Sequence, residues 1–382
     1  MPRAYLDHNA TAPLRGPARA KMLDSLHATG NPSSVHAEGR AARALVEVAR
    51  ENVAALVGGR ARNVIFTSGA TEALALALSG RWRGPRGAPA RLLLSATEHV
   101  AALEGHGFGE SAEILPVDAN GVLDLAALHA ALAGSQGPVL LCQQAANNET
   151  GVLQKVAAAA EKVHAAGGLV VCDAVQAAGR IPYTFETTGA DMLIVSSHKL
   201  GGPQGAGALV LREVSLTCDR PLIRGGGQER GFRAGTENVA AIAGFGAAAE
   251  EALAHREEEA ERLAGLRDKL EAEIARLAPG AKIFGAGVPR LPNTCAFAIS
   301  GLAAETALMA FDLAGVALSS GSACSSGKVR RSHVLAAMGV SDDVARGALR
   351  ASLGWTTTEA DVAAFSTALA EILARIGRKT AV

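Results

Sequence analysis

Between residues 60 and 212 one pattern recurs, and it constrains the fold more than any other feature of the sequence. A short apolar run is followed by a polar or glycine-containing turn and then by an Ala/Leu-rich segment with helical spacing. This alternation predicts a mostly parallel sheet with helices on both faces, since near-continuous apolar strands are buried on both sides. The expected strands are 63–67, 91–95, 112–117, 138–143, 169–173, 191–197 and 206–212, and the expected helices are 70–79, 98–105, 124–133 and 154–166.

The pattern changes after Gly246. Residues 247–277 are rich in Ala, Glu, Leu and Arg at helical spacing, which predicts a helix with a solvated charged face that leads to a smaller domain. The segment 358–376 is also expected to be helical, and Thr358 followed by Asp361 is a plausible cap at its start. Further strand candidates are 294–299, 315–319 and 348–353.

Length and composition argue for a large enzyme-sized core and against several classes of protein. The 382 residues suggest two domains, or one large domain with an appendage. Lys and Arg number 37, as do Asp and Glu, and only 3% of residues are aromatic, so a nucleic-acid binder is not expected. The N-terminus lacks a signal-peptide pattern, and the apolar stretches end before the roughly 18 residues of a membrane helix. No C-x-x-C spacing predicts a structural zinc site, and a reducing cytoplasm fits best.

Lys199 follows the predicted strand 191–197 directly, in the sequence DMLIVSSHKLGGPQGAG. Burial at a strand end would disfavour the ammonium form and lower the pKa of the lysine, which is what a Schiff-base lysine needs. An ordinary lysine just past a strand end explains the segment equally well. This segment alone leaves both interpretations open.

Asp173 ends the predicted strand 169–173, in the sequence LVVCDAVQ. Asp is rarely buried without a partner. An enzyme that uses pyridoxal phosphate (PLP) needs such an acid, because it keeps the pyridine nitrogen protonated so that the ring can accept electrons from the substrate. A cap on the following helix is the alternative, and the residue taken singly does not decide between them.

The segment FTSGATEALA, residues 66–75, runs from a strand through Gly69 into a helix. The free N–H groups at such a helix start bind phosphate. No G-x-x-x-x-G-K-[ST] motif is present, which excludes a P-loop NTPase, and no G-x-G-x-x-G lies between a strand and a helix. Residues 225–235, GGGQERGFRAG, follow no convincing strand and by themselves fit a flexible loop.

Cys324 lies among Ser and Gly in LSSGSACSSGK, residues 318–328. This composition predicts an exposed mobile loop, and the cations Lys328, Arg330 and Arg331 would favour the nucleophilic thiolate. The other cysteines are interpreted as core residues, Cys142 and Cys172, or have no assigned role, Cys218 and Cys295.

Together these segments resemble the cysteine desulfurases of the NifS/IscS type, which belong to the class V aminotransferase family of PLP enzymes. The resemblance covers essentially the whole chain, and both the order and the spacing of the motifs agree. The motifs, each with the number of its first residue, are YLDHNAT at 5, GNPSSVH at 30, FTSGATEA at 66, TEHVA at 97, NNETG at 147, CDAVQ at 172, SSHKLGGPQG at 196, GGGQERGFRAGTEN at 225, SSGSACSSG at 319 and RASLG at 350.

The resemblance implies a fold and a division of the chain. The fold is the type I fold of PLP-dependent transferases, in which a mostly parallel mixed sheet lies between helices. The large PLP-binding domain would span 15–256. A smaller α/β domain would be formed by 1–14 and 257–382 and would carry Cys324.

The resemblance also implies roles for individual residues. Lys199 would bind PLP covalently and move the alpha proton, Cys324 would receive the sulfur, and His99 would stack on the ring and assist proton transfer. Asp173 would pair with the pyridinium nitrogen, and Gln176 would bond the ring hydroxyl. The other implied contacts are Ala70, Thr71, Ser196 and His198 to the phosphate, Thr236 to the phosphate of the partner subunit in a homodimer, Asn148 beside cofactor and substrate, and Arg350 to the substrate carboxylate.

The implied reaction converts L-cysteine to L-alanine and leaves a persulfide on Cys324. Its sulfur would go to an iron–sulfur scaffold or another acceptor protein; no intrinsic metal site is expected, although Cys324 could transiently share a cluster with a scaffold. SSGSAC is the long-loop motif of the family, whereas the chain stops soon after Arg378, without the longer tail linked to scaffold docking. The alternatives are a selenocysteine lyase or another class V lyase, and a non-catalytic sulfur carrier, which the presence of Lys199, Asp173 and His99 disfavours.

Overall fold

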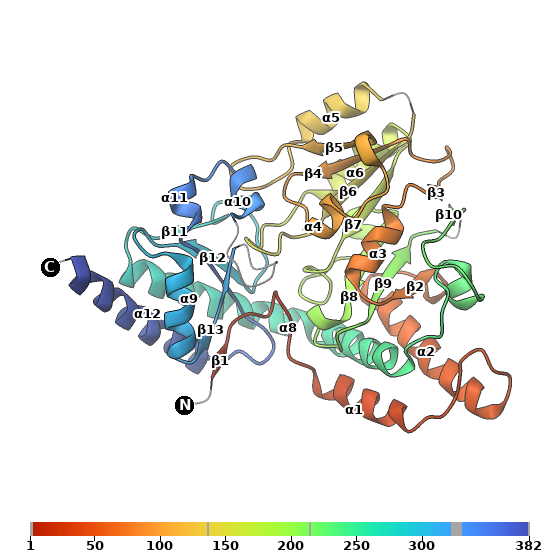
Figure 1. The fold of residues 1–382 in the computed structure, drawn as a ribbon, viewed down its shortest axis with the longest axis horizontal. Coiled ribbons are helices and arrows are strands. Elements are labelled where there is room, and N and C mark those ends of the chain that lie inside the picture. Colours follow the sequence, from red (N-terminus) through yellow and green to blue (C-terminus); the bar gives the residue numbers. More distant parts are fainter. Residues whose placement is uncertain (1–2, 136, 214, 322–330, 381–382) are drawn as a thin grey trace.

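A seven-stranded sheet forms the larger part of the computed structural model, which describes residues 3–135, 137–213, 215–321 and 331–380 (Figure 1). Its strands are β2 Val64–Thr67, β4 Arg91–Ser95, β5 Ala112–Leu115, β6 Val139–Gln144, β7 Leu169–Asp173, β8 Met192–Ser196 and β9 Gly207–Leu211. They lie in the order β2-β9-β8-β7-β6-β4-β5, and β9 is antiparallel to both of its neighbours while the other pairs are parallel. The predicted mostly parallel mixed sheet is confirmed.

Helices cover both faces of this sheet. They are α1 Gly16–Leu26, α2 Ala37–Leu56, α3 Ala70–Ala77, α4 Val100–Leu103, α5 Leu125–Ala133, α6 Val156–Ala165 and α7 Phe185–Thr188. Strand residues alternate between the faces: Leu93 and Leu193 pack in one apolar cluster with α2, α5 and α6, and Leu92 and Leu94 pack in another with α3. This double burial explains why the strands are almost uninterrupted apolar runs.

The two helices α1 and α2 correct the sequence prediction, which has no helix before residue 60. Helix α2 carries Arg and Glu on its outer side, while Ala42, Val46, Ala49 and Val53 are buried at spacings of three and four. Such a stripe packs a helix onto a core even when the helix is polar overall. Helix α4 is shorter than the predicted 98–105 because His99 caps its start.

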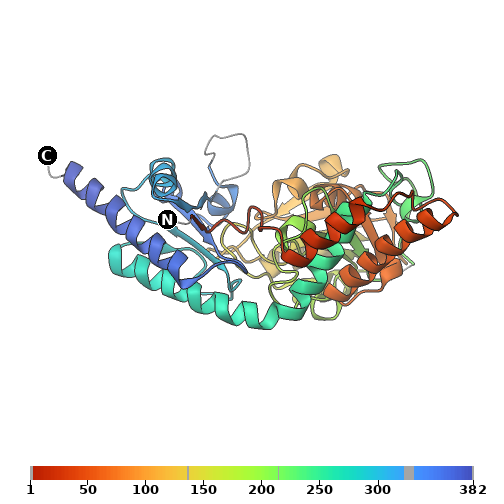
Figure 2. The ribbon, with the colours of Figure 1, turned by 90° about the horizontal axis from the view of Figure 1, so that it is seen from below.

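A second sheet of four antiparallel strands has its own apolar core (Figure 2). Its strands are β11 Lys282–Ile283, β12 Thr294–Ala298, β14 Ser319–Ser320 and β15 Ala348–Ser352, in the order β11-β12-β15-β14. Nearby helices are α9 Ala304–Leu313, α10 His333–Ala337, α11 Asp342–Ala345 and α12 Glu359–Thr380. The rings of Phe311 and Phe365 stack with centroids 5.3 Å apart inside this core, and Phe297 packs edge-on against Phe365.

The N-terminal segment belongs beside this second sheet. The short strands β1 Ala4–Tyr5 and β13 Val316–Ala317 pair in parallel. The predicted single strand 315–319 is therefore wrong, since the chain pairs with β1 before Leu318 and with β15 after it. At the start of α12, the carboxylate of Asp361 accepts hydrogen bonds from the backbone N–H and the hydroxyl of Thr358, both at 2.8 Å, so the predicted cap is confirmed.

Helix α8, Val239–Leu277, connects the two parts and runs along both of them (Figure 2). Its first half contributes to the core beneath the large sheet, and its second half to the core of the small sheet. The helix begins earlier than the predicted 247–277. Gly244 and Gly246, after which the helix was expected to begin, lie inside it. A Cβ at Gly246 would come within 2.4 Å of the backbone of Ala49 in α2, so glycine allows the two helices to approach closely. The predicted domain boundaries at 15–256 and 257–382 remain a prediction.

The glycine-rich segment 225–235 contains a turn anchored by a buried ion pair. Glu229 and Arg230 have positive φ angles of 47° and 56° within the short 3-10 helix η4 Gln228–Gly231. Arg50 donates two hydrogen bonds to the Glu229 carboxylate at 2.7 and 2.9 Å, and the N–H of Phe66 donates a third at 3.0 Å. These bonds attach the segment to β2 and α2. The segment is therefore not the flexible loop that its glycine content suggests.

The remaining elements are short. They are η1 Ala61–Asn63, β3 Trp82–Arg83, η2 Gly109–Ser111, η3 Ser197–Lys199 and β10 Thr217–Cys218. Among the described residues no helix is both long and apolar enough to cross a membrane.

Candidate active site

A cavity of about 630 Å³ lies where several strands of the large sheet end. β2, β6, β7 and β8 run in the same direction, so the residues that follow them meet at one edge, where open α/β sheets bind ligands. The predicted site residues that line this cavity are Ala70, Thr71, His99, Asn148, Asp173, Gln176, Ser196, His198, Lys199 and Arg350.

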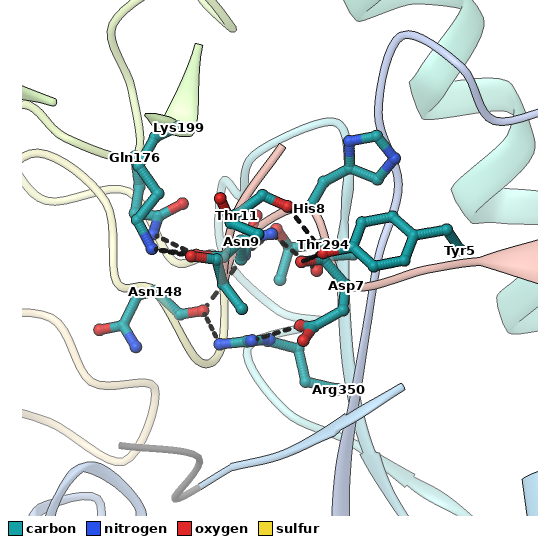
Figure 3. Close-up of polar contacts among 12 residues, drawn as sticks. Tyr5, Asp7, His8, Asn9, Thr11, Asn148, Gln176, Lys199, Thr294 and Arg350 are labelled. Atoms are coloured by element: carbon teal, nitrogen blue, oxygen red, sulfur yellow. Dashed lines mark hydrogen bonds and ion pairs between the residues drawn. The ribbon is translucent and has the colours of Figure 1, made fainter. Parts of the chain in front are cut away.

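The side chain of Lys199 points from the end of β8 toward the N-terminal segment (Figure 3). Its Nζ donates hydrogen bonds to the backbone carbonyl of Asn9 at 2.5 Å and to that of Ala10 at 2.8 Å. The Gln176 amide donates to the same Asn9 carbonyl at 3.1 Å. Lysine and glutamine thus converge on one side of the cavity.

Asp173 ends β7 and is 8% exposed. Its carboxylate accepts a hydrogen bond from the N–H of Val175 at 3.0 Å. Burial raises the pKa of Asp173 to about 6, while the Val175 hydrogen bond and the charge of Lys199 act in the opposite direction. A buried carboxylate of this kind is stabilised by a cation placed against it, which is what a protonated pyridine nitrogen would supply.

His99 caps α4 from the neighbouring strand end. Its Nδ1 accepts a hydrogen bond from the N–H of Ala101 at 3.1 Å, so a neutral ring carries its proton on Nε2. Burial lowers the pKa of His99, and the charges of Lys199 and His333 lower it further. A neutral imidazole therefore faces the cavity near neutral pH.

A phosphate-sized polar end is built from the turn before α3. Gly69 precedes the helix and gives it no side-chain cap, so the first N–H groups are available to a ligand. The Ser196 hydroxyl also lines the cavity, and it is buried with no hydrogen-bond partner among the described residues. A Cβ at Gly207 would lie 2.6 Å from the carbonyl carbon of Gly69, so only glycine lets β9 pass so close to this turn.

His198 and Thr11 complete this end of the site. The His198 Nδ1 lies 3.1 Å from the Thr11 hydroxyl. Burial lowers the pKa of His198 to about 4, with the charges of Lys199 and Arg180 acting in the same direction, so the ring is neutral at pH 7. The orphaned Ser196 hydroxyl, the uncapped helix start and the acid at Asp173 together fit PLP, with a phosphate at one end and a ring nitrogen at the other.

Arg350 lies on β15 and reaches the cavity from the small sheet. Its guanidinium donates to the Asp7 carboxylate at 2.7 Å and to the backbone carbonyl of Asn148 at 3.0 Å (Figure 3). The side chain is only 4% exposed, and its Nε is buried without a partner in the part of the chain that the structure describes. A planar donor with an unsatisfied N–H in a cavity suits a carboxylate ligand.

Asp7 and Asn9 were not assigned any role from the sequence, although the YLDHNAT motif contains both. The Asn9 amide donates to the carbonyl of Asn148 at 3.1 Å and to the hydroxyl of Thr294 at 2.9 Å. The N-terminal segment therefore joins residues of both sheets at the cavity. A polar run directly after a short apolar start was the only signal, and it does not say which distant residues it contacts.

The remaining two predicted site residues are Thr236 and Cys324. Thr236 is exposed on the surface of this chain, after the turn held by Glu229. Cys324 lies outside the described residues. The segment that contains it is flanked by Gly321, directly after β14, and by Ser332, directly before α10.

Comparison with known proteins gives consistent matches over nearly the whole chain. The aminotransferase class-V family matches residues 4–365. A cysteine desulfurase of Cereibacter sphaeroides is 43% identical over 95% of this chain and 93% of its own length. The crystal structure of a NifS-like protein from Rickettsia africae is 33% identical, with a TM-score of 0.86 over 97% of this chain and 99% of its own. A structure described as SspA in complex with cysteine is 26% identical, with a TM-score of 0.76 over 92% of this chain and 99% of its own.

Proposed function

The chain belongs to the aminotransferase class-V family, and we propose how its residues carry out the reaction of a cysteine desulfurase. It is a PLP-dependent enzyme that takes sulfur from L-cysteine. The observation that carries the assignment of roles is the cavity in which Lys199, Asp173 and Arg350 meet. A lysine, a buried acid and a carboxylate-binding arginine are the groups that an amino-acid substrate and this cofactor require.

Bound PLP supplies an electron sink for the pair left on the substrate when a bond at its alpha carbon breaks. Lys199 would hold the cofactor covalently through Nζ. Asp173 would hold a proton on the ring nitrogen, and pairing with that cation would offset the burial that raises the pKa of Asp173 to about 6. Ser196 and the start of α3 would bind the phosphate, and Ala70, Thr71 and His198 line the same cavity.

Lys199 and His99 move protons. The Lys199 amine would take the proton from the alpha carbon of the bound substrate. His99 is neutral, because burial and the charge of Lys199 lower its pKa, so it can accept a proton at Nε2 and return it. Gln176 and Asn148 line the same cavity and would keep the ring in position.

Arg350 fixes the substrate by its carboxylate. Its Nε has no partner within the described residues, and its Nη atoms are held by Asp7 and Asn148. This arrangement pre-orients the guanidinium before the substrate arrives, which lowers the entropy lost on binding. Because Arg350 comes from the small sheet and Lys199 from the large one, the substrate is bound between the two parts of the chain.

Cys324 receives the sulfur. Its thiolate attacks the sulfur of bound cysteine, so a sulfur–sulfur bond forms and the carbon–sulfur bond of the substrate breaks. The electron pair of the broken bond stays on the substrate carbon, which is then protonated to give the methyl group of L-alanine. The products are alanine and a Cys324 persulfide, and no outside oxidant is needed.

The fate of the sulfur and the setting of the enzyme complete the proposal. The persulfide on Cys324 is delivered to a cytoplasmic iron–sulfur scaffold or another acceptor protein, as its SSGSAC motif favours. The enzyme is a homodimer in which Thr236 reaches the phosphate of the partner subunit. Thr236 is exposed a few residues after the turn that the Arg50–Glu229 pair anchors, which supports this role.

A single-turnover experiment tests the assignment. PLP-loaded enzyme is mixed with one equivalent of L-cysteine, alanine is quantified, and the persulfide is located by alkylation and peptide mass spectrometry. We expect one alanine per active site and the extra sulfur on Cys324. The Cys324→Ser variant should bind PLP but form no persulfide, and Lys199→Ala should lose turnover.

Two outcomes would contradict the proposal. Full alanine release by Cys324→Ser would point instead to a lyase that does not use the loop cysteine, and a comparison of cysteine with selenocysteine would then identify its substrate. Extra sulfur found on another cysteine would refute the assignment of Cys324.

A further inference from the structure

Glu149 is a buried acid that the reaction above does not use. It lies in the NNETG motif and is 6% exposed. Its backbone N–H donates to the side chain of Asn147 at 2.9 Å, and the Asn147 amide donates to the carbonyl of Thr97 at 3.1 Å. The loop that carries Glu149 is therefore tied to the loop that carries His99. Burial of a carboxyl group costs free energy unless its contacts compensate, so those contacts call for an explanation.

The Glu149 carboxyl group is hydrogen-bonded to Ser332, which follows the segment that contains Cys324, and lies close to Gly321, which precedes it. On one side, the hydroxyl of Ser332 donates to its Oε2 at 2.5 Å. On the other, a Cβ at Gly321 would lie 3.2 Å from the same Oε2, so the backbone there passes directly by the carboxylate. One oxygen atom thus lies against the residues before and after 322–330.

Ser332 also caps the start of α10. Its Oγ accepts a hydrogen bond from the N–H of Leu335 at 3.0 Å while it donates to Glu149. The next residue, His333, places its Nε2 2.9 Å from the carbonyl of Glu98, beside His99. Two adjacent residues that follow the Cys324 segment are therefore bound to loops at the end of the large sheet.

The residue before Glu149 holds the substrate-binding arginine. The Asn148 carbonyl accepts from Arg350 at 3.0 Å, and strand β14, which leads into Gly321, pairs with β15 at Arg350. Consecutive residues of one loop thus bind Arg350 and the flanks of the cysteine segment. The same loop therefore connects Arg350, the proposed ligand of the substrate carboxylate, with the residues on either side of the Cys324 segment.

We propose that Glu149 is a positioning residue that fixes both flanks of the Cys324 segment relative to Arg350, so that Cys324 can reach the sulfur of bound substrate. The proposal rests on the desulfurase activity above and adds a residue to it. Glu149 does not touch the substrate. It acts through Ser332 and Gly321, and its loss is felt in the sulfur-transfer step rather than in substrate binding.

The strength of the hydrogen bond between Ser332 and Glu149 depends on whether the Glu149 carboxyl group is ionised. Burial raises its pKa to about 7, and the Ser332 hydrogen bond and the charge of Arg350 moderate the rise. Further polar groups on the elements around it are Asn147, the titratable His333 next to Ser332, and Asp7, which pairs with Arg350. A hydrogen bond to a charged acceptor is stronger than one to a neutral acceptor, so Ser332 is held more firmly once the carboxyl group has lost its proton.

The test compares Glu149→Ala, Glu149→Gln and Ser332→Ala as PLP-loaded enzymes. Steady-state alanine production gives kcat and KM, and the absorbance change of the cofactor on addition of L-alanine reports binding without Cys324. Misplacement of a reacting group by about 1 Å costs roughly 100-fold, so we expect a fall in kcat of about 10- to 100-fold for both alanine variants. KM and the alanine-induced absorbance change should stay near wild type, since Arg350 is untouched.

The glutamine variant and a matched cap variant separate positioning from folding. The amide oxygen introduced by Glu149→Gln still accepts from Ser332, so this variant should recover most of kcat at low pH. The wild-type rate should then exceed it increasingly as the pH rises through about 7. Asp124→Ala removes a comparable side-chain cap from α5, where Asp124 accepts from Ala126 and Ala127, and should leave kcat unchanged.

An unchanged kcat in Glu149→Ala would overturn the inference, as would a rise in KM with kcat preserved. A Glu149→Gln enzyme with the same pH profile as wild type would overturn the role of the charge. If wild-type enzyme itself made no alanine from cysteine, the proposed function would be wrong, and this result is distinct from both.

Discussion

Replacement of Glu229 by alanine should destabilise the protein more than almost any other single surface-loop change. Arg50 and Glu229 are both nearly fully buried, with side chains 6% and 2% exposed. Two hydrogen bonds from Arg50 and one from Phe66 converge on the carboxylate. Without Glu229 the only remaining ion-pair partner of Arg50 among the described residues is the exposed Glu47, 3.2 Å from its Nε. Loss of one partner of a buried ion pair costs about 3–5 kcal/mol.

The expected shift in melting temperature follows from the size of the chain. Unfolding entropy is about 2.1 cal/mol/K per residue, which for 382 residues gives about 0.8 kcal/mol/K. A loss of about 3–5 kcal/mol should therefore lower the Tm by about 4–6 °C. Differential scanning calorimetry of wild type and Glu229→Ala, each with saturating PLP, measures this shift.

A double replacement refines the prediction. In Arg50→Met with Glu229→Leu no buried charge remains from this pair, and the main cost is the unpaired N–H of Phe66, about 1–3 kcal/mol. The double variant should therefore be more stable than Glu229→Ala alone. As a control, Asp343→Ala breaks the exposed pair with Arg346 and should change the Tm by less than about 1 °C. A Glu229→Ala protein that melts within about 1 °C of wild type, or a double variant less stable than the single one, would refute the reasoning.

Three further predictions concern the site itself. The folded-state pKa of Asp173, about 6, lies above its usual 3.8, so the folded chain binds this proton more tightly than the unfolded chain and stability falls as pH rises. In cofactor-free protein the unfolding free energy of Asp173→Asn should therefore gain about 2 kcal/mol on wild type between pH 4 and 7, and a constant difference in urea titrations would argue against it. Gly207→Ala should push the Gly69 turn away and weaken PLP binding by at least about tenfold in an absorbance titration, whereas Gly137→Ala, around which the described residues leave open space, should not. Arg350→Lys keeps the charge but loses the forked geometry, so KM for cysteine should rise at least about tenfold while PLP absorbance is unchanged; an unaltered KM would exclude Arg350 as the carboxylate ligand.

Local pattern was enough to predict most of the large sheet. Leu92 to Leu94 and Val170 to Cys172 belong to runs buried on both faces, and few structures other than a central strand tolerate such a run between polar turns. Helix α2 was missed because its buried stripe is made mainly of Ala and Val among many charges. The start of α8 was missed because Gly244 and Gly246 suggest a break, whereas the structure uses them for close helix packing.

The site could be predicted from the sequence only where a residue's role is local or is implied by family resemblance. Asp173 ends an apolar strand and Lys199 follows another within three residues, so their position could be inferred. The bond between Asp7 and Arg350 joins residues 343 positions apart, and no periodicity or spacing signals such a pair. Glu149 was overlooked for the same reason, because its partner Ser332 lies 183 positions further on.

The long-range pairing of the N-terminal segment has a consequence for synthesis on the ribosome. Strand β1 pairs with β13, and Asp7 pairs with Arg350. The N-terminal segment is synthesised first, but it can form these contacts only after nearly all of the chain has been synthesised. The carbonyls of Asn9 and Ala10, which accept hydrogen bonds from Lys199, belong to this N-terminal segment. A nascent chain can therefore assemble the large sheet early, yet it cannot complete its cofactor pocket until residue 350 has emerged.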